Sequence, residues 1–191
     1  GQRGGEPDRL IFIIHRTKDK VEYLGTDEIY FYHLDAKDRS EEAKKLRVLL
    51  KLAKKQKTIV VTSVDAILRK YIPKKVLLDN IFTYKIGDII NLEELSQNLV
   101  RLGYERVSRI EGLGQFSIRG GIIDVYSLEY TNPIRIELFD DEIDSIRTFD
   151  VFSQKSIDKI KKVVITPSRE FIYPEDTTSA VEKIKAETNK Y

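Results

Sequence analysis

Two neighbouring stretches decide the fold: residues 103–126, which read GYERVSRIEGLGQFSIRGGIIDVY, and residues 134–150, which read IRIELFDDEIDSIRTFD. Apolar and polar residues alternate along both stretches, and glycines or an acidic pair interrupt the alternation. Period-two alternation is typical of half-buried strands, and Gly and Asp are common where strands turn. The two stretches therefore predict a compact antiparallel meander with one core face and one exposed face.

Arginines are prominent in the set of side chains expected on the exposed face, namely Arg106, Arg109 and Arg119. A guanidinium group can hold a carboxylate or a phosphate with two parallel hydrogen bonds, and a sheet gives it a rigid base. No arrangement typical of a catalytic centre accompanies these arginines. The meander therefore predicts a docking surface and no catalytic residues.

The pair Gly120–Gly121 leaves two interpretations open. Glycines inside a strand pattern can mark a β-bulge, which would turn Arg119 outward beside Phe116 or Gln115. They can equally mark a corner of the sheet that closes the fold. The residues alone do not choose between these two interpretations.

The flanking sequence predicts an α/β unit. Strands and helices alternate in it, which favours a parallel sheet with crossover helices. The strands are expected at residues 9–14, 28–34 and 58–62, with helices at 41–55 and 64–70. Ser63 is expected to cap the second helix, which ends before Pro73. A helix capped by Asn91 and ended by Gly103 comes next, and a strand at 163–166 and a helix at 178–187 follow the meander.

A change of period near Asp88 predicts the domain organisation. Residues 1–87 and 155–191 are expected to form one α/β domain. Residues 88–154 are expected to form an inserted, antiparallel β-rich module of the α+β type.

Composition narrows the class of protein. The chain has 191 residues, of which 41% are hydrophobic, and a net charge of +2 from 33 basic and 31 acidic residues. Because charges of both signs are interspersed along the chain, its net charge does not indicate a protein that binds nucleic acid. The chain has no cysteine, no apolar run of about 20 residues and no visible leader, so a cytoplasmic protein without membrane contact is expected.

Chemical motifs are missing or weak. No phosphate loop of the form GxxxxGK[ST] occurs, so neither ATP binding nor another cofactor is expected. Asp140, Asp141 and Glu142 could hold a divalent cation, but a hairpin turn explains them better. His15 and His33 stand alone, without a motif for a zinc site or a hydrolase triad. The sequence therefore predicts no metal site and no enzyme.

Residues 115–126 followed by 134–150 resemble the UvrB-homology region of the transcription-repair coupling factors, the Mfd family, and more distantly UvrB. The shared pattern is an Arg-Gly after a short strand, an apolar strand containing Asp, and a hairpin of the type RIEFFDDEIDS. Asp150, Gln154 and residues 165–170 continue the pattern. The resemblance is strong from about residue 58 to residue 171.

The resemblance implies a degenerate UvrB-like parallel-sheet domain that has lost its nucleotide site and carries an inserted UvrA-binding module. It implies UvrA as the partner, while RNA polymerase and DNA would be bound by other domains of a longer protein. The positions that correspond to UvrA-contacting arginines of UvrB are Arg106, Ser117 and Arg119, and Ser117 departs from the arginine of UvrB. Phe116 is expected to be either a contact residue or part of the core.

Two other classes of function stay open. The lysine-rich helix at 41–55 and the acidic turn could belong to a DNA-binding or nuclease-like domain, which a salt titration with duplex DNA would reveal. A structural or autoinhibitory domain that braces a motor would bind the motor and not UvrA.

Overall fold

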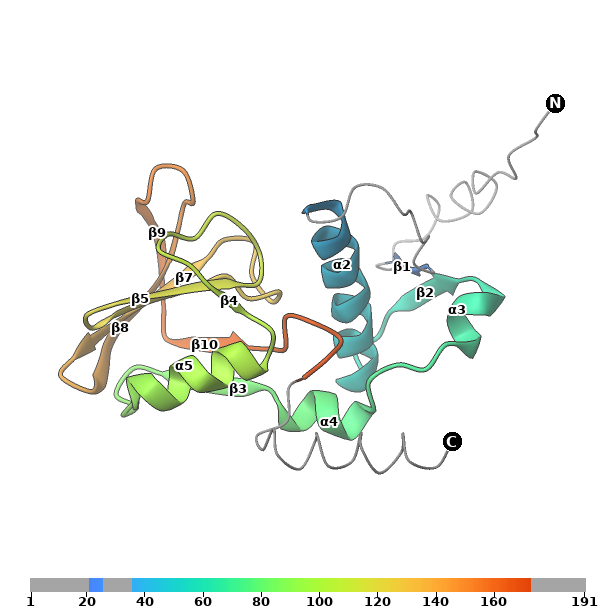
Figure 1. Cartoon of the computed structure of the whole chain (residues 1–191), viewed down its shortest axis with the longest axis horizontal. Coiled ribbons are helices and arrows are strands. Elements are labelled where there is room, and N and C mark those ends of the chain that lie inside the picture. The colour runs from blue at the N-terminus through green and yellow to red at the C-terminus, as the bar shows by residue number, and fades with distance from the viewer. Residues whose placement is uncertain (1–20, 26–35, 173–191) are drawn as a thin grey trace, which may run out of the picture.

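The structure is a computed structural model that describes residues 21–25 and 36–172, with side chains from residue 41 onward in the second range. The predicted strands at 9–14 and 28–34, the predicted helix at 178–187 and both histidines lie outside these residues. In the described part, a first unit extends to residue 81 and a β-rich module, residues 82–171, follows it. Figure 1 shows the two lying side by side, with a long helix of the first unit facing the module.

The first unit is a small α/β arrangement. Its strands β1 (Val21–Leu24) and β2 (Ile59–Thr62) are parallel, and α2 (Ala36–Ala53) connects them. Two short helices follow, α3 (Val64–Leu68) and α4 (Lys74–Asp79). The parallel pair with a crossover helix agrees with the sequence prediction, but within the described residues the parallel sheet has only these two strands. The larger UvrB-like parallel sheet stays a prediction.

Local sequence explains where these helices lie. The Ser63 hydroxyl accepts a hydrogen bond from the backbone N–H of Ala66 at 3.2 Å, so it caps α3 as predicted. Pro73 precedes α4 and suits a helix start, because a first-turn residue needs no backbone donor. The sequence predicted no helix after this proline, so α4 is an addition to the predicted elements.

The module is built on a six-stranded sheet with the order β4-β5-β6-β7-β8-β9, packed with a separate pair β10-β3 and with α5 (Leu92–Arg101). Its strands are β3 (Phe82–Lys85), β4 (Glu105–Arg106), β5 (Gln115–Arg119), β6 (Ile122–Val125), β7 (Ile134–Phe139), β8 (Glu142–Phe149), β9 (Ser156–Ile160) and β10 (Lys162–Ile165). The pairs from β5 to β9 are antiparallel, so the predicted meander is confirmed and extended by β9.

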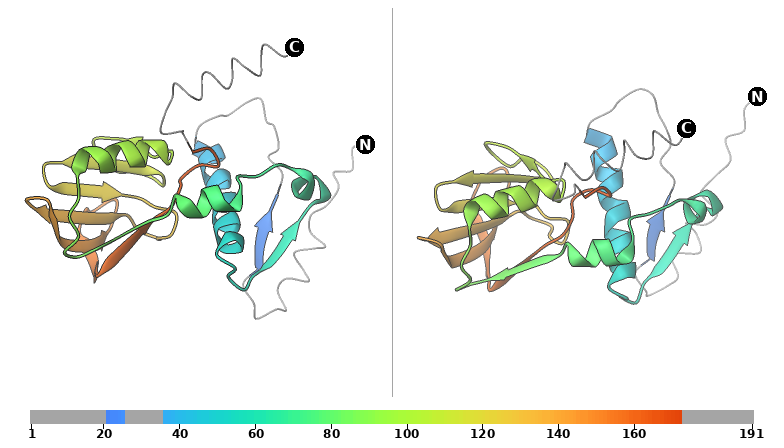
Figure 2. Two further views of the ribbon diagram at one scale, coloured as in Figure 1. Left: turned by 90° about the horizontal axis from the view of Figure 1, so that it is seen from below. Right: turned by 60° about the horizontal axis from the view of Figure 1, so that its bottom comes forward.

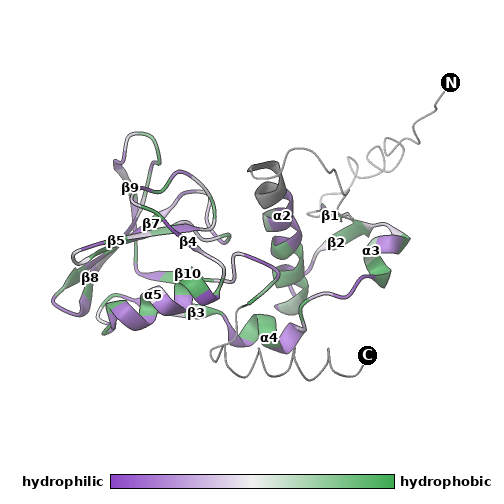
Figure 3. Cartoon of the chain, in the orientation of Figure 1, coloured by the Kyte–Doolittle hydropathy of each residue, from purple (hydrophilic) through white to green (hydrophobic). Residues whose placement is uncertain are grey.

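The core of the module lies between one face of this sheet and α5 together with β3 and β10 (Figure 2). Alternate strand residues such as Ile123, Ile136 and Ile146 are almost completely buried in it. Polar and apolar residues also alternate around α5 in Figure 3, and its Leu95 and Leu99 face the core. The apolar side of α5 therefore covers the module core.

Both ends of α5 follow the predicted caps. The Asn91 side chain accepts hydrogen bonds from the backbone N–H groups of Glu93 and Glu94 at 3.0 and 3.1 Å. Gly103 has φ +85°, and a Cβ atom there would lie 2.8 Å from Cγ of Arg169. Glycine is thus required at the helix end by both the left-handed backbone and the close neighbour.

The predicted strand at 163–166 is present as β10, and its partner β3 lies inside residues 1–87. β10 pairs with β3 in antiparallel register, and Val163 and Ile165 lie in the core of the module. No strand was predicted at β3, whose four residues lie between α4 and a short turn. A pairing partner about 80 positions away leaves no local signal. The division at residues 88 and 154 stays a prediction, and the packing favours wider limits for the module.

Gly120 and Gly121 form a two-residue hairpin turn between β5 and β6, because Arg119 pairs with Ile122 across them. The β-bulge interpretation is therefore wrong, and the pair is a tight turn that joins two neighbouring strands of the same sheet. Gly120 has φ +58°, and a Cβ atom at Gly121 would lie 3.2 Å from the carbonyl oxygen of Leu138. The acidic pair Asp140–Asp141 likewise forms the turn between β7 and β8.

Contacts of α2 hold the first unit against the module. Leu128 of the module is buried among residues of α2 and α4. The Arg47 side chain donates to the carbonyl oxygen of Leu128 at 2.9 Å, and Lys54 forms an ion pair with Glu129 at 2.8 Å. The buried Lys45 forms an ion pair with Glu170 at 3.4 Å. Lys45 and Lys54 of α2 thus connect the first unit to the module, so these two lysines are not simply solvated.

We expect the core of the module to be sensitive to the loss of single side chains. Ile136→Ala should lower the free energy of unfolding by about 3 kcal/mol, because the fully buried side chain leaves a cavity. Urea denaturation followed by circular dichroism measures this change. Val100→Ala, at a half-exposed position of α5, should change it by about 0.5 kcal/mol or less. Equal effects of the two substitutions would contradict this core assignment.

Candidate protein-docking surface

The face of the six-stranded sheet opposite α5, called the outer face below, carries a row of polar side chains. The strand register sets Ser117, Asp124, Arg135, Arg147 and Lys159 next to one another across five strands. Side chains in register on neighbouring strands project to the same face and lie about 5 Å apart. The predicted meander therefore brings together charged groups from distant parts of the sequence.

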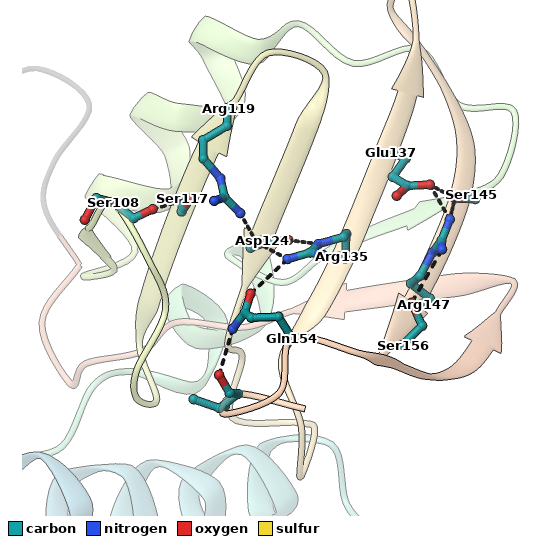
Figure 4. Close-up of polar contacts among 11 residues, drawn as sticks. Ser108, Ser117, Arg119, Asp124, Arg135, Glu137, Ser145, Arg147, Gln154 and Ser156 are labelled. Carbon is teal, nitrogen blue, oxygen red and sulfur yellow. Dashed lines mark hydrogen bonds and ion pairs between the residues drawn. The ribbon is translucent and has the colours of Figure 1, made fainter. Parts of the chain in front are cut away.

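Asp124 is the centre of this row. It is 2% exposed, and its carboxylate accepts three hydrogen bonds from two arginines. Arg135 donates Nε to Oδ1 at 2.7 Å and Nη2 to Oδ2 at 2.8 Å, and Arg119 donates Nη2 to Oδ2 at 3.1 Å. Figure 4 shows both arginines pointing toward this residue from the flanking strands. A buried carboxylate is costly unless paired and hydrogen-bonded, and here it is both.

Contacts with three residues hold the Arg135 side chain in place. Its guanidinium carbon lies 4.4 Å from the centre of the Phe149 ring, and its Nη2 also donates to Oε1 of Gln154 at 3.2 Å. The hydrogen bond with Asp124 raises the pKa of Arg135 above its ordinary value, so the group stays charged. Since its side chain is only 17% exposed, Arg135 mainly positions its neighbours.

Arg119 is the exposed member of the cluster. Its side chain is 54% exposed, and the one hydrogen bond to Asp124 orients the guanidinium group on the surface. Guanidinium has five N–H donors, so donors stay available for a ligand while the group is held in place. A pre-oriented guanidinium loses less conformational entropy on binding a carboxylate than a mobile one does.

A second ion-pair cluster lies beside the first on the outer face. Arg147 pairs with Glu137, and the Ser145 hydroxyl donates to Oε2 of Glu137 at 2.8 Å. Arg147 also donates to the Ser156 hydroxyl at 3.4 Å. These contacts, drawn in Figure 4, make the outer face a patterned surface of both charges.

Two of the residues predicted to contact a partner are buried. Phe116 is 0% exposed and belongs to the core of the module, which decides the open choice for this residue in favour of the core. Ser117 is 1% exposed because the loop after β4 covers it, and its hydroxyl donates to the carbonyl oxygen of Ser108 at 3.4 Å. Neither side chain is therefore accessible on the surface, and a contact role for Ser117 stays a prediction. Ser108, whose carbonyl oxygen accepts this hydrogen bond from Ser117, is itself exposed.

Arg106 and Arg109 are also exposed, but they lie at different places on the module. Arg109 donates to the carbonyl oxygen of Phe152 at 3.1 Å, so it ties the covering loop to the turn after β8. Arg106 lies in the edge strand β4 and pairs with Phe116 in parallel register. Phe116 points to the core side, so Arg106 projects from the sheet edge on that side and Arg119 projects from the outer face. The three arginines therefore do not form a single cluster.

Asp124, Arg135 and Gln154 belong to the site in the structure but were not among the predicted site residues. The available signal was a lone carboxylate inside the otherwise apolar stretch IIDV, together with an arginine at an outward position of the next strand. Such a carboxylate requires a partner when the strand is buried. Only the strand register shows which arginines supply it.

Other kinds of site find no support in the described part of the chain. Among residues 21–25 and 36–172, no group of three or more His, Cys, Asp or Glu side chains is arranged to hold a metal ion. The same residues include no helix of the length and apolarity that a membrane crossing requires.

Comparisons with known proteins point to the same part of the chain. Residues 82–171 match the family model described as the UvrB interaction domain. These limits coincide with the module that packs as one core in the structure.

Longer proteins match most of the chain. A transcription-repair-coupling factor of Bacillus subtilis (strain 168) is 43% identical over 143 residues, covering 74% of this chain and 12% of that protein. Those of Staphylococcus haemolyticus (strain JCSC1435) and Staphylococcus aureus (strain USA300) are 34% and 32% identical, covering 83% and 84% of this chain. The chain spans 12% to 14% of the length of these three relatives.

We expect Asp124 to be the most important polar residue of the outer face for stability. Asp124→Asn should lower the free energy of unfolding by about 3 kcal/mol, because the little-exposed Arg135 then lacks its counter-charge. Asp144→Asn, which removes an exposed carboxylate from β8, is the matched control and should have little effect. Urea denaturation of both variants tests the difference, and equal stabilities would show that the cluster is not stabilising.

Proposed function

Because residues 82–171 belong to the UvrB interaction domain family, and the chain is homologous over most of its length to transcription-repair-coupling factors, we propose that it recruits UvrA for such a factor. In this role the chain binds and does not catalyse. Recruitment of UvrA would connect a stalled transcription complex to nucleotide excision repair. RNA polymerase and DNA would be bound by other parts of the longer protein.

The observation that carries this proposal is the arrangement of Arg119. Its guanidinium group is held by a buried carboxylate and is still half exposed on a rigid sheet. This is the geometry that suits a carboxylate on a protein partner, because two parallel hydrogen bonds can form without reordering the side chain. We propose Arg119 as a contact residue and Asp124 and Arg135 as the residues that position it.

Arg106 is the second proposed contact residue, at the edge of the same sheet. It is exposed and lies on β4, next to the strand that carries Arg119. Because it projects from the opposite side of the sheet, it would meet the partner at the rim of the interface. Rim charges mainly affect the association rate and its salt dependence.

We expect substitution of the exposed arginine to weaken UvrA binding. Arg119→Ala should cost on the order of 2 kcal/mol of binding free energy if the ion pair becomes desolvated, and Arg106→Ala should cost less. Titration calorimetry with purified UvrA measures both effects. Lys70→Ala, an exposed basic residue of the first unit, is the control.

Unchanged affinity of the Arg119→Ala, Arg106→Ala double variant would place the docking surface elsewhere. A parent chain that fails to bind UvrA but binds duplex DNA with steep salt dependence would support the nucleic-acid alternative. A parent chain that binds only the motor part of the longer protein would support the bracing alternative.

We expect no ATP binding by this chain, since the amide cradle and lysine of a phosphate loop are missing from its sequence. Titration of the chain with magnesium and ATP at micromolar concentrations should give no saturable heat. A saturable signal that survives buffer-matched dilution would contradict the non-catalytic role.

A further inference from the structure

The outer face continues from Arg119 into an apolar strip formed by Ile89, Ile122 and Phe139. These side chains are 63%, 37% and 80% exposed. Scattered exposed apolar residues are ordinary, but neighbouring ones on a single face suit an interaction site. The strip lies beside Arg119, the proposed contact residue for UvrA.

The strand register shows that the strip is continuous with Arg119. Ile122 pairs with Arg119 on one side and with Glu137 on the other. Phe139 follows Glu137 by two positions along β7, so it projects to the same face at a diagonal from Ile122. Such diagonal neighbours are within reach of an aromatic side chain.

The far end of the strip is fixed in the same way. Glu142 pairs with Phe139 across the turn of the β7–β8 hairpin, and Ile89 forms an isolated antiparallel bridge with Glu142. The backbone N–H of Ile90 also donates to the carbonyl oxygen of Asp141 at 2.8 Å. The strip therefore rests on hydrogen-bonded backbone, as a preorganised contact surface would.

Acidic side chains surround the Phe139 end of the strip. Four exposed carboxylates lie in the hairpin that carries it: Asp140, Asp141, Glu142 and Asp144. A second copy of the chain placed symmetrically on this strip would bring two such acidic tips together, and like charges at short distance repel. The charge pattern instead favours a different protein that has basic groups around an apolar pocket.

We propose that the strip is the apolar part of the UvrA-docking surface and that Phe139 fills an apolar pocket on UvrA flanked by basic side chains. This inference rests on the function proposed above. The interface would then have two chemically different halves: Arg119 meets carboxylates at one end, and Phe139 with its acidic neighbours meets an apolar, basic region at the other. Buried aromatic anchors of this kind commonly dominate binding energy.

The test compares UvrA binding of the parent chain with that of Phe139→Ala and Phe139→Leu. We expect Phe139→Ala to weaken the dissociation constant at least about tenfold, and Phe139→Leu to keep most of the affinity, because leucine retains apolar area. Melting curves by circular dichroism should coincide for all three proteins, since the side chain is largely exposed. Leu68→Ala, at a similarly exposed leucine of α3, is the matched control and should bind like the parent.

The salt dependence of UvrA binding distinguishes the two halves of the proposed interface. The effect of Arg119→Ala should shrink between low and high salt because the screened ion pair contributes less, whereas the effect of Phe139→Ala should persist. An effect of Phe139→Ala that vanishes at high salt would overturn the apolar contact.

The remaining outcomes distinguish a failure of this inference from a failure of the proposed function. Unchanged affinity of Phe139→Ala, in a chain whose affinity Arg119→Ala does reduce, overturns this inference and leaves the proposed function intact. A parent chain that does not bind UvrA overturns both. Sedimentation that shows a dimer in the parent and a monomer in Phe139→Ala would assign the strip to self-association and overturn the inference.

Discussion

The outer face depends on one buried charge. Asp124 stands in the middle of an apolar strand, where an unpaired carboxylate would be strongly unfavourable. Arg135 neutralises it from one neighbouring strand and Arg119 from the other. The need to pair this carboxylate fixes the side chains of both arginines, and one of them keeps exposed donors. A requirement of folding thus also produces an oriented guanidinium group on the surface.

The same sheet separates stability from recognition. Its inner face is buried against α5, β3 and β10 by apolar residues, and its outer face carries ion pairs and an exposed apolar strip. Because neighbouring residues of a strand point to opposite faces, outward residues can change without altering the core. The division has an exception where the loop after β4 covers part of the outer face and buries Ser117.

The first unit contributes through its attachment to the module. Leu128 of the module is buried against α2, and ion pairs of Lys45 and Lys54 connect the two parts at their edges. A sheet held in this way presents its outer face in a defined orientation to the rest of a longer protein. The basic residues of α2 therefore support the architecture, which weakens the argument that they form a groove for DNA.

Local sequence determined the elements whose signals are local. Alternation predicted the meander, Asn91 and Gly103 set the limits of α5, and Ser63 set the start of α3. Each of these depends on residues a few positions apart, so no distant contact is needed to identify it. Of the arginines expected on one exposed face, Arg119 lies on the outer face.

Long-range packing determines which distant residues meet. It paired β10 with β3, buried Phe116 and Ser117, and placed Arg106 and Arg119 on different sides of the sheet. It also joined Asp124 to its two arginines and aligned Phe139 with Ile122. Strand register and loop packing depend on long-range contacts, for which a single sequence carries no local pattern.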